Sequence, residues 1–225
     1  MTALFFYFNL LGNWQEKIID QFFLKKIPPS EIVIIGIDEE SIAQIGQWPW
    51  PRQVFADLLE QILHPRIVGI DVNLSESSRV GASDDIAFAQ SLRNAPYSIV
   101  LPVSINERGR IVSEPISEFK KIVTFGFVNV PVDYDGIARH VTRSNGDTPS
   151  FAYALAGKES GVPEHFRVDY QGLEKTFLTV SFYDVLQKKI PARILEDKII
   201  LIGSVAPSFH DTIQTAFGFM PGVEF

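Results

Sequence analysis

Three aspartates place carboxylates where a sheet of this kind could do chemistry. Asp38 and Asp71 each follow a Gly-Ile pair that ends an apolar run, and Asp211 follows a third apolar run after a short loop. Ligands of open α/β sheets bind beyond the carboxyl ends of the strands, so these side chains would share a crevice if the strands are neighbours. Carboxylate oxygens would suit a divalent cation there. The alternative, which we favour, is that each carboxylate caps a following helix or loop through backbone N–H groups.

The segment 48–52, Trp-Pro-Trp-Pro-Arg, is a second group with chemical potential. It is not a helix interior, because Pro lacks the N–H donor and clashes with the preceding turn. Trp48 and Trp50 could form a stacking platform, with Arg52 as a bidentate clamp for an anion. We favour a structural interpretation, in which the indoles fill core space and Arg52 forms an ion pair. The partners considered for Arg52 are Asp38, Asp71 and Asp84.

Other reactive side chains lack the spacing that their chemistry needs. Ser204, His210 and Asp211 are the residue types of a hydrolase triad, but no Gly-x-Ser-x-Gly elbow surrounds the serine. Residues 133–136, Asp-Tyr-Asp-Gly, lack the closing acid of a calcium loop and predict a tight turn whose acids can pair with Arg139. The histidines have no ligand spacing, and the absence of Cys excludes disulfides and thiolate metal sites. No cofactor is predicted.

The elements that position these residues alternate between strand and helix. The apolar runs 32–37, 67–72 and 198–202 predict buried strands, and the apolar spacing of 52–63 predicts a helix. The strand–helix–strand order predicts that 32–37 and 67–72 form a parallel pair with a right-handed crossover. Further predicted elements are helices at 14–24, 84–93 (capped by Ser83), 151–156 and 183–187, strands at 97–101 and 177–180, a turn at 106–109, and paired strands at 123–130 and 137–142.

Composition sets the broad class. With 46% hydrophobic residues and 18 Phe among 225 residues, the chain can build a substantial core, which excludes a disordered protein. A net charge of −7 argues against non-specific binding of nucleic acid and against electrostatic attachment to anionic lipid. No linker or repeat divides the chain. We therefore predict a single α/β domain with a mixed, largely parallel sheet flanked by helices, and an N-terminal helix.

Several blocks of sequence form an ordered set along the chain: 32–52, Gly69-Ile70-Asp71-Val72, 84–89, 126–130 with Asp133, Asp135, Gly136 and Arg139, 198–204, Asp211-Thr212 and 220–224. In this order they resemble the blocks of the CHASE2 domain family. The acidic positions of the family's first helix agree at Glu16 and Asp20, although its Tyr is Ile19 here. The resemblance implies a non-catalytic, extracytoplasmic sensor domain of a bacterial membrane receptor. Membrane helices would then transmit the signal, and a cytoplasmic cyclase or kinase module would produce the output.

The resemblance also sets expectations for organisation and partners. We expect residues 1–27 to be an N-terminal membrane-proximal helix and residues 28–225 to be the sensor domain. The apolar start, 1–12, is shorter than the roughly 20 residues that cross a bilayer, and is either a helix of the domain or the end of a membrane helix. The expected partners are an unknown small ligand or stimulus, the membrane through flanking helices, and a second copy in a homodimer, but no nucleic acid. The candidate ligand-binding residues are Asp38, Trp48, Trp50, Arg52, Asp71 and Asp211.

Two other functions stay open. The chain could be a ligand-free dimerisation or protein-interaction module of an envelope protein. A stand-alone hydrolase built around Asp38 and Asp71 ranks far below both. For a sensor, the predicted helix 14–24 would connect to the first membrane helix, which makes it the candidate element for passing a change of state to the membrane.

Overall fold

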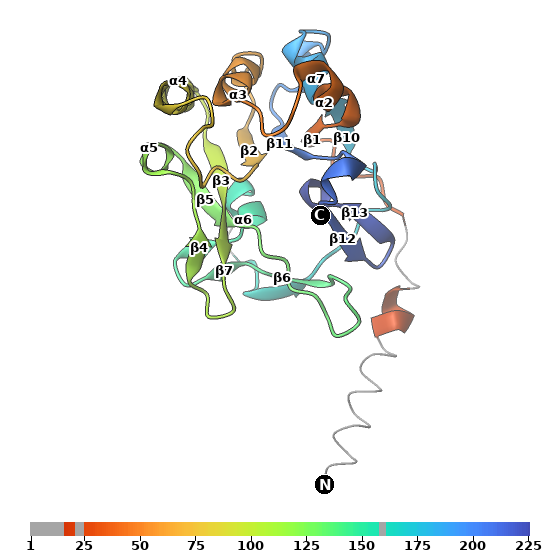
Figure 1. Ribbon diagram of the computed structural model, residues 1–225. Coiled ribbons are helices and arrows are strands. Elements are labelled where there is room, and N and C mark those ends of the chain that lie inside the picture. The colour runs from red at the N-terminus through yellow and green to blue at the C-terminus, as the bar shows by residue number, and fades with distance from the viewer. Residues whose placement is uncertain (1–15, 21–24, 158–160) are drawn as a thin grey trace.

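A largely parallel sheet forms the centre of the molecule (Figure 1). The computed structural model describes residues 16–20, 25–157 and 161–225. The strands of the sheet are β1 (Ile32–Ile37), β2 (Ile67–Asp71), β3 (Ile99–Ile105), β4 (Ile111–Ser113), β5 (Thr124–Phe127), β10 (Leu178–Ser181) and β11 (Ile199–Ser204). They pair in the order β10-β1-β11-β2-β3, and β3 also pairs with β5 in parallel and with β4 in antiparallel orientation. The predicted α/β fold with a mixed, largely parallel sheet is confirmed.

The predicted pairing of the first two strands is wrong. β11 lies between β1 and β2, so that Ile37 is in register with Ser204 and Gly203 with Asp71. A strand–helix–strand unit fixes the parallel direction and the hand of the crossover, but it leaves room for a later strand to insert. The apolar run of β11 favours such a central position, because both of its faces are then covered.

Helices cover the two faces of the sheet unequally. Five pack on one face around a core that includes Phe55, Phe88, Phe119 and Phe182. Among the described residues one helix, α6 (Phe151–Leu155), packs on the other face against a smaller cluster that includes Val100. The five helices are α2 (Glu39–Ile45), α3 (Arg52–Leu59), α4 (Ala82–Asn94), α5 (Ser117–Lys120) and α7 (Phe182–Leu186).

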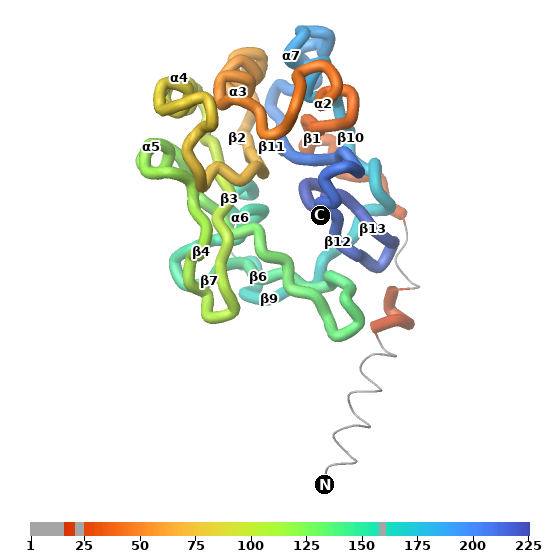
Figure 2. Tube along the Cα trace, viewed as in Figure 1, coloured from red at the N-terminus to blue at the C-terminus, as the bar shows by residue number. Residues whose placement is uncertain are grey.

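Short strand pairs lie beyond one end of the sheet (Figures 1 and 2). β6 pairs with β9, β7 with β8 and β12 with β13, each in antiparallel orientation. The predicted pairing of 123–130 with 137–142 is therefore wrong, because β5 pairs with β3 and β6 with β9. The bounds are β6 (His140–Thr142), β7 (Ser144–Asn145), β8 (Thr148–Pro149), β9 (His165–Arg167), β12 (Thr212–Thr215) and β13 (Gly218–Pro221).

Several predicted boundaries shift. Residues 16–20 are helical, and the rest of the helix expected at 14–24 lies outside the described residues. Helix α4 begins at Ala82 after Gly81, so Ser83 is inside the helix rather than its cap. Short 3-10 helices occur at η1 (Ala192–Ile194), η2 (Pro207–Phe209) and η3 (Gly222–Glu224). Within the described ranges, every helix is too short or too polar to cross a membrane.

Candidate functional site

Asp38 is the N-cap of helix α2. Its Oδ1 accepts hydrogen bonds from the backbone N–H of Ser41 at 2.8 Å and from the hydroxyl groups of Ser41 and Ser181. Glu39 and Glu40 follow in the first turn, where the positive end of the helix dipole stabilises negative charge. No helix was predicted at 39–45, although an Asp followed by two acids is itself an N-terminal helix signal. The capping alternative therefore describes Asp38.

Asp71 and Asp211 interact across the same edge of the sheet. Burial, and second the charge of Asp211, raise the pKa of Asp71 from 3.8 to about 6. Burial also raises the pKa of Asp211, which packs against Gly222: a Cβ added at this glycine would lie 3.0 Å from the Asp211 carboxylate. Burial of Asp71 and the like charge of the neighbouring Asp211 both favour the protonated form of the Asp71 carboxyl.

The three predicted carboxylates do not converge. The end of β11 separates Asp38 from Asp71, and the buried Ser204 hydroxyl there has no hydrogen-bond partner within the described part of the chain. In residues 16–20, 25–157 and 161–225, no three acidic, His or Cys side chains are grouped as metal ligands. The cation site considered for Asp38, Asp71 and Asp211 thus has no support in the geometry.

The two indoles pack into the main core. Trp50 is 3% exposed, and its Nε1 donates a hydrogen bond to the carbonyl of Gly46 at 2.9 Å. Trp48 meets Trp50 and Phe209 edge to face, with ring centroids 5.1 Å apart in both pairs. Edge-to-face contacts of this kind stabilise aromatic clusters. These contacts match the structural interpretation of the corner.

Arg52 is buried at the start of α3, and its Nε has no hydrogen-bond partner among the described residues. Its Nη2 donates to the carbonyl of Glu76 at 2.8 Å, and its Nε lies 3.5 Å from an oxygen of Asp85. The backbone N–H groups of Arg52 and Gln53 donate to Asp84, which supplies the cap that Pro51 cannot provide. Burial alone would raise the pKa of Asp84, but hydrogen bonds from Ser78 and from these N–H groups outweigh it and lower that pKa. The carboxylates of Asp85 and Asp84 therefore partly balance the charge of the guanidinium.

Trp48, Trp50 and Arg52 line a small pocket of about 260 Å3 together with the loop 72–80. Asp38, Asp71 and Asp211 do not line it. The structure therefore brings together three of the six candidate residues and leaves the other three outside. A ligand-binding role for the six stays a prediction.

A buried ionic cage surrounds Arg139, whose side chain is 1% exposed. Within the turn 133–136, Asp133 accepts from its Nη1 at 2.8 Å and Asp135 from its Nη1 and Nη2 at 2.8 and 2.9 Å. The pairing expected between Arg139 and the acids of this turn is confirmed. Hydrogen bonds that Arg139 donates to Asp135 and Asp20 raise the pKa of Arg139, and those donated to Asp135 lower the pKa of Asp135.

The N-terminal helical segment contributes the rest of this cage. Asp20, 119 residues earlier in the chain, accepts from the Nε and Nη2 of Arg139 at 3.1 and 2.7 Å. Arg167 donates to Asp20 at 3.0 Å and also pairs with Glu16. We define the Arg139 cage as the set Glu16, Asp20, Asp133, Asp135, Arg139 and Arg167. The match of Glu16 and Asp20 to the acidic positions of a family helix was the only sequence signal for their part in it.

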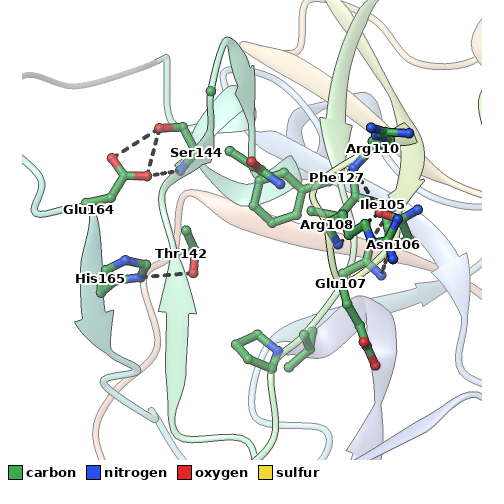
Figure 3. Close-up of a pocket in the computed structure, with 15 residues that line it drawn as sticks. Ile105, Asn106, Glu107, Arg108, Arg110, Phe127, Thr142, Ser144, Glu164 and His165 are labelled. Carbon is green, nitrogen blue, oxygen red and sulfur yellow. Dashed lines mark hydrogen bonds between the residues drawn. The ribbon is translucent and has the colours of Figure 1, made fainter. Parts of the chain in front are cut away.

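A larger groove lies between the turn 106–110 and the ends of β6, β7 and β9 (Figure 3). Its volume is about 1140 Å3. From the sequence, only a turn and strand ends are predicted for these residues, and no binding site. Because the groove joins segments that are distant in sequence, no local motif marks it.

The model of the CHASE2 domain family matches residues 1–225, the whole chain. No curated protein and no solved structure was found to match it. The ordered blocks of sequence, the parallel sheet and the match over the full length agree. The chain belongs to the CHASE2 family, whose members are extracytoplasmic sensor domains of receptors.

Proposed function

We propose that this chain is the non-catalytic stimulus-sensing domain of a bacterial membrane receptor, anchored at the extracytoplasmic face by flanking membrane helices. It would pass its signal through those helices to a cytoplasmic cyclase or kinase module. A stimulus acts by binding one arrangement of the domain more tightly than another, which shifts an equilibrium that already exists.

The Arg139 cage is the observation that carries this proposal. The segment 16–20 contacts the described domain through Glu16 and Asp20, which bind arginines just before β6 and at the end of β9. Ion pairs of this kind need defined geometry, because a charge that loses its partner in a buried site is strongly unfavourable. A small change in the position of β6 or β9 would therefore move the arginines that hold the N-terminal segment, and with them the segment itself.

The absence of Cys from the chain allows a clean test by spin labelling. Labels are attached at Lys17→Cys on the N-terminal segment and Ser83→Cys on α4, both exposed positions, and their separation is measured by double electron–electron resonance. We expect one narrow distance in the parent chain, and a second population when Asp20→Asn removes the shared acceptor. The matched control is Asp169→Asn, which breaks an exposed ion pair with Lys26 and should leave the distribution unchanged. Identical distributions for Asp20→Asn and the parent would contradict the proposal.

The homodimer expected from the sequence belongs to the same proposal. The edge strand β4 carries exposed apolar side chains, with Ile111 44% and Val112 63% exposed. An exposed edge with apolar residues is a surface on which another chain can pair. Sedimentation velocity should give a dimer that Val112→Lys weakens. A monomer at all concentrations would remove the dimer from the proposal.

A further inference from the structure

The large groove offers positive charge that the protein itself does not neutralise. Figure 3 shows the turn with Arg108 and Arg110 on one side and Ser144, Glu164 and His165 on the other. Within the described residues, neither guanidinium has a hydrogen bond or an ion pair. Both arginines are exposed. They are available to a ligand.

The acidic side chains of the groove do not cancel this charge. Glu164 is engaged by Arg143 at 2.8 Å and by the backbone and hydroxyl of Ser144. Glu107 lies on the turn itself and forms no ion pair with either guanidinium among the described residues, so its single negative charge offsets only one of the two positive charges. His165 bonds Thr142 through Nδ1 at 3.1 Å, which leaves its Nε2 for a ligand. The uncompensated charge of the groove is therefore positive, although the whole chain carries −7.

The turn that carries the arginines is held in place before any ligand arrives. The side-chain carbonyl of Asn106 accepts from the N–H groups of Arg108 and Arg110, both at 3.0 Å. Asn129 pairs with both backbone groups of Ile105, at 2.7 and 2.9 Å. Such preorganisation favours binding because less conformational freedom is lost when a ligand binds.

We propose that this groove binds a small polyanion, a molecule with two or more carboxylate or phosphate groups, between the turn 106–110 and the ends of β6 and β9. The guanidinium fork matches carboxylate and phosphate oxygens in pairs. The volume of about 1140 Å3 leaves room for a molecule that carries several anionic groups, which fits better than a single ion.

The proposal rests on the proposed sensor function and adds the ligand to it. Strands β6 and β9 form an antiparallel ribbon (Figure 2). This ribbon joins the groove to the Arg139 cage, because Thr142 and His165 line the groove and Arg167 belongs to the cage. Thr142 and His165 face each other at the groove end, and His140 and Arg167 at the cage end. A ligand that draws the turn and the ribbon together thus acts on strands whose other ends hold the N-terminal segment.

Isothermal titration calorimetry with the 225-residue chain tests the groove. Citrate and pyrophosphate are the probes, so that the two arms separate carboxylate from phosphate recognition. The test variant is Arg108→Gln with Arg110→Gln, and the matched control is Arg93→Gln with Arg193→Gln, which removes two exposed charges elsewhere. We expect at least one probe to bind the parent chain, the test variant to bind it at least tenfold more weakly, and the control to bind within about twofold of the parent, because a lost charged hydrogen bond is worth about a factor of ten or more.

Two outcomes would overturn the groove proposal: no binding of either probe by the parent chain, or equal losses in the test and control variants. Its failure is distinct from failure of the sensor proposal. If the parent chain binds a probe but Asp20→Asn leaves the label distance unchanged, the groove proposal stands and the proposed transmission through the Arg139 cage is refuted. If Asp20→Asn shows a second label distance but the parent chain binds neither probe, the transmission proposal stands and the groove proposal is refuted.

Discussion

Asp71 should make the domain less stable as the pH rises through the weakly acidic range. Its pKa is raised from 3.8 to about 6, first by burial and second by Asp211. Between these values the folded chain binds more protons than the unfolded chain, so the free energy of unfolding falls with rising pH in that window. A shift of about two units, at about 1.36 kcal/mol per unit, gives roughly 3 kcal/mol, which is fully expressed at pH 7.

Asp71→Asn removes the charge and keeps the shape. Urea unfolding, followed by tryptophan fluorescence, is measured for both chains from pH 4 to pH 8. The free energy of unfolding of the variant minus that of the parent should rise by about 2.5 kcal/mol across this range, because about 0.5 kcal/mol of the effect is already expressed at pH 4. Asp211→Asn should make the pH dependence of the parent smaller, because it removes the second cause of the shift.

A difference between Asp71→Asn and the parent that stays constant from pH 4 to pH 8 would refute this reasoning. A difference that falls with pH would mean that the ionised carboxylate is stabilised in the folded chain, as a bound cation or an unseen donor would do.

Three further substitutions test the packing and polar contacts. Asp38→Ala should lower stability at pH 7 by about 1 kcal/mol through loss of the α2 cap, and Asp38→Asn should retain most of it in the same urea assay; equal losses would contradict the capping role. Gly126→Ala places a Cβ 2.4 Å from the Cα of Phe151 and should cost about 1–3 kcal/mol; an unchanged melting temperature in calorimetry would contradict it. Arg139→Met should destabilise by about 2–4 kcal/mol, because it removes the buried guanidinium that three partly buried carboxylates share, and a loss below 1 kcal/mol would show that the cage adds little.

The buried strands and the class of fold could be predicted from the sequence because each depends on a local pattern. The continuous apolar runs of β1, β2 and β11 mark strands that are covered on both faces. The turn at 133–136 and its pairing with Arg139 were also predictable, since those residues lie within seven positions of one another.

The arrangement in space depends on contacts that no local pattern contains. The insertion of β11 between β1 and β2 is decided by how the whole sheet buries its apolar strands. The bond between Asp20 and Arg139 spans 119 residues, and either residue alone resembles an ordinary surface charge in the sequence. The groove was missed for the same reason, because Arg108 and His165 come from separate segments.

The most direct test of the central claim is the output of a receptor that carries this domain. The chain, with membrane helices on either side, is joined to an adenylate cyclase module, and cyclic AMP is measured in cells at matched membrane levels. Asp20→Asn and Arg139→Lys should shift the output in the same direction by more than about fivefold, because each loses charged hydrogen bonds worth about 1.5 kcal/mol or more, while Asp169→Asn should not. Unchanged output in both cage variants, with the domain still folded, would contradict the account.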